Sequence, residues 1–93
     1  MMKFDVERTV SYWLEGAQYD LGVANAMFKG KKYPYALFMG HLALEKILKA
    51  VIVKNRKTHA PFTHSLPYLA ENSKLEIPEA ILVKLREFME FHF

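Results

Sequence analysis

The stretch YALFMGHLALEKILKAVIVK, from Tyr35 to Lys54, decides the fold of this chain. Apolar side chains would cover nearly every side of a helix formed by this stretch. A few polar side chains interrupt them, namely His41, Glu45, Lys46 and Lys49. Charged groups inside a bilayer are costly, so this pattern does not suit a membrane span. We therefore predict the central helix of a small bundle that lies outside any membrane.

Length and composition indicate one compact domain. The chain has 93 residues, of which 52% are hydrophobic and 25% are charged. A chain of this size buries only about two thirds of its unfolded surface, so its stability is modest unless subunits associate. Cysteine is absent, which excludes disulfides and thiolate chemistry and suits a reducing compartment. The N-terminal residues lead into charge rather than an apolar core, so we expect no signal peptide and a cytoplasmic location.

The charge balance permits several partners without requiring any of them. The formal net charge is +3, which is compatible with a nucleotide or RNA but is more often the charge of a solvated surface. Charge alone therefore does not identify a nucleic-acid-binding protein.

Helical spacing continues upstream of the central stretch. From Asp5 to Phe28, apolar residues recur three and four positions apart, which predicts a first helix of about six turns. Gly30 is expected to end this helix as a left-handed cap, and Pro34 prevents its continuation. Because the connection is short, the central helix should run back antiparallel to the first.

Two prolines downstream mark the starts of further helices. Pro67 fits only a first turn, so Thr63 or Ser65 is expected to cap a short helix there. Pro78 opens a last helix whose apolar pattern continues to the end of the sequence. These patterns predict an all-α fold: a small up-and-down antiparallel helical bundle of three long helices plus one short helix. We expect residues 1–93 to form a single domain.

Polar residues on the first two helices are expected to pair with each other. Asp20 falls on or near the apolar stripe of the first helix, where a carboxylate needs a partner. Lys46 and Lys49 on the facing helix, together with His41, are the available groups. Glu45 lies four residues from His41 and from Lys49, but a metal site would need a third ligand that we cannot assign. We predict a structural cluster rather than a catalytic base, with no metal or cofactor.

Three sequence blocks, taken in order, resemble the HEPN domain family (higher eukaryotes and prokaryotes nucleotide-binding). The blocks are Ala17-x-x-Asp20-Leu21-x-x-Ala24, then His41-Leu42-Ala43-Leu44-Glu45-Lys46-Ile47-Leu48-Lys49-Ala50, then Thr63-His64-Ser65-Leu66-x-x-Leu69-Ala70. The resemblance covers the chain from about Trp13 onward. It implies a bundle of four or five helices that forms a homodimer. Such domains are often encoded beside a minimal nucleotidyltransferase in a two-component, toxin-antitoxin-like arrangement.

The resemblance also implies a possible catalytic pair. Many HEPN proteins are metal-independent ribonucleases that use an arginine followed, after four to six residues, by a histidine. Arg86 and His92 have this spacing, with the arginine expected to hold a phosphate and the histidine to transfer protons. Six steps on a regular helix place the two side chains about 120° apart, so a distorted helix or a second subunit is needed to bring them together. Arg86 can equally pair with Glu90, one turn further on.

The sequence departs from the family pattern at its end. Related members usually continue with an Arg-Tyr-Pro segment, so we expect a chain that is either shortened at the C-terminus or a minimal version. We favour a dimeric HEPN module that binds nucleotide, a nucleotidyltransferase partner or both, without chemistry of its own. The alternative is a HEPN ribonuclease (toxin) that uses Arg86 and His92. A third hypothesis is a helical interaction domain with no nucleotide role.

Overall fold

A computed structural model describes residues 4–73 of the chain, and within this range the only regular elements are helices. They are α1 (Val6–Lys29), α2 (Tyr33–Arg56) and α3 (Leu66–Asn72). The all-α prediction is confirmed, as are the two long helices and the short one. The predicted last helix after Pro78 lies outside the described residues, and the single domain over residues 1–93 stays a prediction.

The first helix begins and ends with well-defined caps. Asp5 is the N-cap, where its Oδ1 accepts a hydrogen bond of 3.0 Å from the backbone N–H of Arg8. At the other end, the predicted left-handed conformation of Gly30 is wrong, because its φ is −82°. Lys31 adopts that conformation instead, with φ of 61°. The backbone N–H of Lys32 then bonds to the carbonyl of Met27 at 2.8 Å, which is the Schellman closure one residue later than expected.

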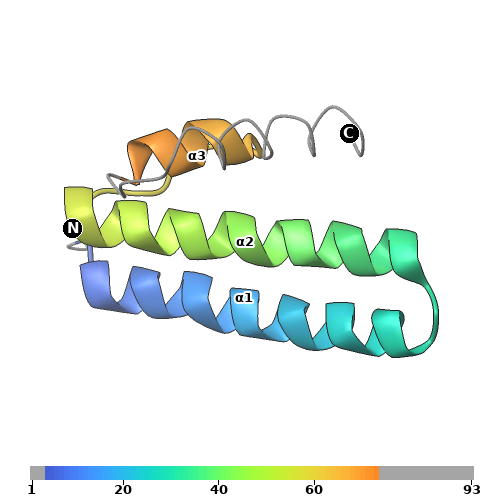
Figure 1. The fold of residues 1–93 in the computed structure, drawn as a ribbon. Helices are drawn as coiled ribbons and strands as arrows, with labels where there is room; N and C mark the ends of the chain where they lie inside the picture. Colours follow the sequence, from blue (N-terminus) through green and yellow to red (C-terminus); the bar gives the residue numbers. More distant parts are fainter. Residues whose placement is uncertain (1–3, 74–93) are drawn as a thin grey trace.

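The second helix runs back along the first (Figure 1). Pro34 lies in its first turn, as the fixed φ of proline allows. Lys57, with φ of 56°, ends the helix in the left-handed conformation. The α3 helix then begins at Leu66, with Pro67 in its first turn, and Ser65 caps it by accepting a hydrogen bond of 3.3 Å from the N–H of Tyr68. Of the two predicted caps, Ser65 is therefore the one used.

The core forms where α3 packs on the C-terminal half of α2, on the side away from α1 (Figure 1). Its buried members come from these two helices: Leu48, Ile52, Leu66, Leu69 and Ala70. The α1–α2 hairpin extends beyond α3 toward its turn. Large apolar residues near that turn, including Phe28, Tyr33 and Leu37, are exposed.

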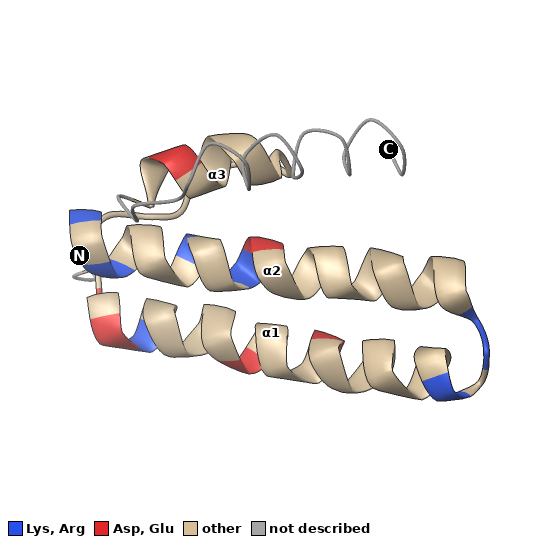
Figure 2. Ribbon diagram, in the orientation of Figure 1, with Lys and Arg blue, Asp and Glu red and all other residues tan. Residues whose placement is uncertain are grey.

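Charged residues are unevenly distributed along the hairpin. Figure 2 shows Lys and Arg at the turn and at the opposite end, with a long uncharged stretch of α2 leading away from the turn. Within residues 4–73, no helix combines the length and the apolar character needed to cross a membrane.

Candidate functional site

Asp20 and Lys46 join α1 to α2. The Lys46 Nζ lies 2.7 Å from Asp20 Oδ2, in a geometry that makes the contact an ion pair rather than an aligned hydrogen bond. The aspartate side chain is 6% exposed and the lysine 28%, so the anion lies inside the bundle while the cation reaches toward solvent. A Cβ at Gly16, one turn earlier, would lie 3.2 Å from Lys46 Cδ. The missing side chain at Gly16 therefore leaves room for the lysine stem.

Glu45 is the centre of a second polar group. Its Oε2 accepts a hydrogen bond of 3.3 Å from the Nζ of Lys49, one turn further along α2. Its Oε1 lies 2.9 Å from His64 Nδ1 and 3.9 Å from His41 Nε2. Glu45, Lys49 and His41 are all buried. The structure thus places the five predicted polar residues in two groups: Asp20 with Lys46, and Glu45 with Lys49 and His41. His64 joins the second group.

Sequence reasoning did not single out His64, which lies between α2 and α3. The carboxylate of Glu45 can only accept, so His64 Nδ1 carries the hydrogen and Nε2 is left for another partner. The imidazole is 80% exposed while the glutamate side chain is 5% exposed. Its backbone is held on the C-terminal side, where Ser65 N–H donates to Thr63 Oγ1 at 3.1 Å. The Thr63-His64-Ser65 motif was the available signal. The contact itself joins His64 to Glu45 on α2, and these two residues lie 19 positions apart in the sequence.

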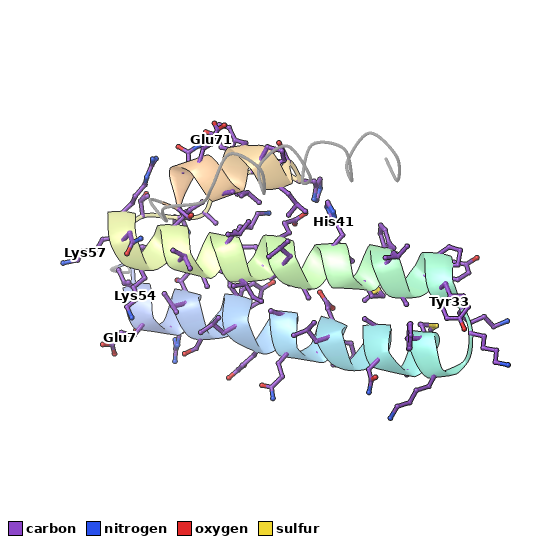
Figure 3. All side chains as sticks on the ribbon, in the orientation of Figure 1. Glu7, Tyr33, His41, Lys54, Lys57 and Glu71 are labelled. Carbon is purple, nitrogen blue, oxygen red and sulfur yellow. The ribbon has the colours of Figure 1, made fainter. Side chains whose placement is uncertain are left out.

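A small cleft opens beside this histidine. Its volume is about 210 Å³, and it is lined by Phe38, His41, Leu42, Glu45 and His64. Figure 3 shows His41 projecting from α2 toward the side on which α3 lies. Across residues 4–73, no group of three or more His, Cys, Asp or Glu side chains is arranged to hold a metal ion. The predicted pair Arg86 and His92 lies outside the described residues, so its geometry stays a prediction.

Trp13 lies between the buried Lys49 and the surface. The Nζ of Lys49 lies 5.0 Å from the centroid of the Trp13 ring, a cation–π distance. The ring of Tyr12 packs edge-on against Trp13, with centroids 5.2 Å apart. Both aromatic residues line open hollows on the surface. The buried polar group therefore supports one side of an aromatic surface.

An apolar stripe runs along one flank of α1. Leu14, Leu21 and Phe28 are exposed and are spaced seven residues apart, which brings them back to nearly the same side of a helix. At the turn end, the stripe meets a groove of about 460 Å³. The groove is lined by Leu21, Ala24, Asn25, Phe28, Tyr33, Ala36 and Leu37. Phe28 contacts Tyr33 edge-on at 5.4 Å between centroids, so α1 and α2 share one apolar surface.

The fold and the site define a class of protein: a small all-α module built on a helical hairpin, with charged residues paired in its interior. The chain matches the model of the HEPN domain over residues 10–92. It therefore belongs to the HEPN family, and the resemblance drawn from its motifs is confirmed. Membership places it among helical modules related to nucleotides and RNA, which commonly dimerise. Comparisons with curated proteins and with solved structures give no match.

Proposed function

We propose that this chain is a dimeric HEPN module that binds nucleotide, a minimal nucleotidyltransferase partner or both, without chemistry of its own. Its setting would be a two-component, toxin-antitoxin-like system. The observation that carries the assembly role is the exposed apolar stripe of Leu14, Leu21 and Phe28, together with the groove at its turn end. The partner and the two-component setting rest on the family resemblance.

A second copy of the chain suits this stripe. Bulky apolar residues repeated every seven positions form the seam by which one helix packs along another. A single small domain gains stability by burying such a surface, and a two-fold axis would place the same stripe on both subunits. The groove continues the seam onto α2 through Tyr33 and Leu37.

The polar residues support a structural role. Glu45 has its two oxygens beside Lys49 and His64, and Asp20 lies against Lys46. The Asp20–Lys46 pair joins α1 to α2, and both carboxylates are engaged with these partners rather than free to act as a nucleophile or base. This arrangement favours a binding module over an enzyme built on α2.

Sedimentation equilibrium of the parent chain and of Leu21→Glu tests the assembly role. Leu21 is 50% exposed, so each of two symmetry-related leucines can gain about half of the ~1.5–3 kcal/mol of full burial, and the dimer should weaken at least ~10-fold. Tyr19→Glu is the matched control, because Tyr19 is exposed on the same helix but points about 160° away from Leu21. A parent chain that stays monomeric at high concentration, or a control that weakens association equally, would contradict the proposed seam.

Two further measurements test the remaining parts of the proposal. Purified dimer should leave RNA intact. Cleavage that disappears in Arg86→Ala and in His92→Ala would support the ribonuclease alternative instead.

A nucleotidyltransferase encoded next to this chain should co-elute with it in size-exclusion chromatography. Separate elution would remove the partner from the proposal.

A further inference from the structure

An open cleft lies where the start of α1 meets the segment that follows α2. Its volume is about 390 Å³, within the range of small-molecule sites. The lining residues come from both segments: Arg8, Thr9, Tyr12, Trp13, His59 and Ala60. The site is therefore assembled from residues about 50 positions apart in the sequence.

Aromatic rings form the walls of this cleft. Tyr12 and Trp13 contribute an edge-on pair from α1. His59 comes from the segment after α2, and its ring packs against Phe4 at 4.2 Å between centroids. Lys49 approaches the Trp13 ring from inside the bundle, which holds the indole in place. A planar ligand that enters the cleft would meet rings that are already positioned.

Arg8 supplies a cation at the same place. Its side chain is exposed, and within residues 4–73 no carboxylate lies close enough to form an ion pair with its guanidinium. More positive charge gathers at this end of the hairpin, where Figure 3 shows Lys54 and Lys57 near the start of α1. Glu7 lies there too, so the local field is positive but not uniformly so. An unpaired guanidinium beside aromatic rings is suited to a phosphate carried by a planar ring.

We infer that this cleft is the nucleotide-binding site of the chain. The base would lie against Tyr12 and Trp13, and the phosphate would be held by Arg8. The inference rests on the nucleotide-binding part of the proposed function and adds its location. It places the ligand outside the buried polar group of Glu45, Lys49 and His41 on α2.

A second hollow, next to the cleft along α1, indicates which end of the site would hold the phosphate. It has a volume of about 290 Å³ and is lined by Tyr12, Trp13, Glu15, Gly16 and Lys46. Both hollows share the two aromatic residues, so they form one surface that runs along the hairpin. The second hollow holds Glu15 and Lys46, but Lys46 is already paired with Asp20. Arg8 in the first hollow has no carboxylate partner within residues 4–73. The phosphate is therefore assigned to the Arg8 end.

Trp13 is the only tryptophan in the chain, so its fluorescence reports this site alone. Titration with adenosine monophosphate should give saturable quenching. Adenosine and inorganic phosphate should each bind more weakly, because each makes only half of the contacts. Isothermal calorimetry should give the same dissociation constant. Arg8→Gln should weaken binding at least 10-fold, and Tyr12→Leu should weaken it at least 5-fold.

Lys29→Gln is the matched control for Arg8→Gln. It removes the same charge from α1 at the other end of the hairpin, and it should leave the dissociation constant within 2-fold. Arg8, Tyr12 and Lys29 are all exposed, and circular dichroism would verify that each variant is folded.

The outcomes separate this inference from the proposed function. Heat of binding that persists unchanged in Arg8→Gln and Tyr12→Leu would overturn the site while leaving nucleotide binding in place. Absence of binding in both measurements would overturn the site and the nucleotide role together. The assembly role would still be decided independently, because sedimentation measures it without any nucleotide.

Discussion

Removing either member of the Asp20–Lys46 ion pair should destabilise the bundle, but by unequal amounts. Asp20→Ala leaves a lysine whose side chain is 28% exposed, so its ammonium can return to water. Lys46→Met leaves a carboxylate whose side chain is only 6% exposed. An uncompensated buried charge is the more costly result. The pair should therefore behave asymmetrically, although both substitutions break the same contact.

The magnitudes follow from this difference in exposure. A hydrogen-bonded or ion-paired contact to a charged group contributes about 1.5–3 kcal/mol net. With the lysine able to regain water, Asp20→Ala should lower the free energy of unfolding by about 1–3 kcal/mol. Lys46→Met should lower it by about 3–5 kcal/mol, the usual cost of breaking a buried pair from the side that leaves the charge inside. The double variant should cost less than the sum of the two, because the charge left behind is then gone.

Urea unfolding followed by circular dichroism measures these free energies. All variants must be compared at one protein concentration, since dimer formation would add to apparent stability. Glu15→Ala on the exposed side of α1 is a control and should change stability by less than about 0.5 kcal/mol. Two results would refute the reasoning: a cost below about 0.5 kcal/mol for Asp20→Ala, or a Lys46→Met variant no less stable than Asp20→Ala.

The same unfolding measurement checks three further predictions. Glu45→Ala should cost about 3–5 kcal/mol because it strands the buried Lys49, whereas His64→Ala should cost only about 1 kcal/mol because that imidazole is largely exposed. Equal costs would mean that Glu45 does not hold Lys49 and His64 together. Asp5→Ala should cost about 1 kcal/mol by removing the cap of α1, and an unchanged midpoint would show that another group caps it. Gly22→Ala should raise the free energy of unfolding by about 0.5–1 kcal/mol, because nothing lies within 4 Å of the added Cβ and alanine favours a helix. A loss of stability would mean that the added methyl group clashes with a neighbouring atom.

The helical elements could be predicted because their signals are local. Apolar spacing identified α1 and α2, and the prolines at 34 and 67 lie in first turns, where they restrict only their own neighbours. The left-handed cap was misplaced by one residue for a local reason as well. Glycine is the usual choice for that conformation, yet here α1 continues to Lys29 and the reversal falls on Lys31. Periodicity identifies a helix more reliably than it identifies the last residue of that helix.

A contact between two helices could be predicted only where the pattern of one helix required a partner and the facing helix offered few candidates. Asp20 on an apolar stripe required a cation, and the facing helix offered few, so Lys46 was among the candidates. Choosing between Lys46 and Lys49 depends on the rotation of α2 about its own axis, which sequence spacing does not determine. The contact from His64 to Glu45 was missed because it depends on how an irregular connector returns to α2. The cleft lined by Arg8 and Trp13 was missed for the same reason, since its lining residue His59 also lies on that connector.

The residues that carry the family signature and the residues proposed to meet the ligand are different sets. Asp20, Glu45 and Lys49 belong to the HEPN motifs and lie buried against partners, so a change at any of them acts first on folding. Arg8 and Tyr12 are exposed, and the motifs that carried the resemblance do not include them. A motif composed of buried, paired residues specifies how two helices dock and says little about what the surface binds. Family membership therefore constrains the scaffold of this protein more tightly than its ligand, and the ligand site that we propose lies among exposed residues at the start of α1 rather than among the motif residues.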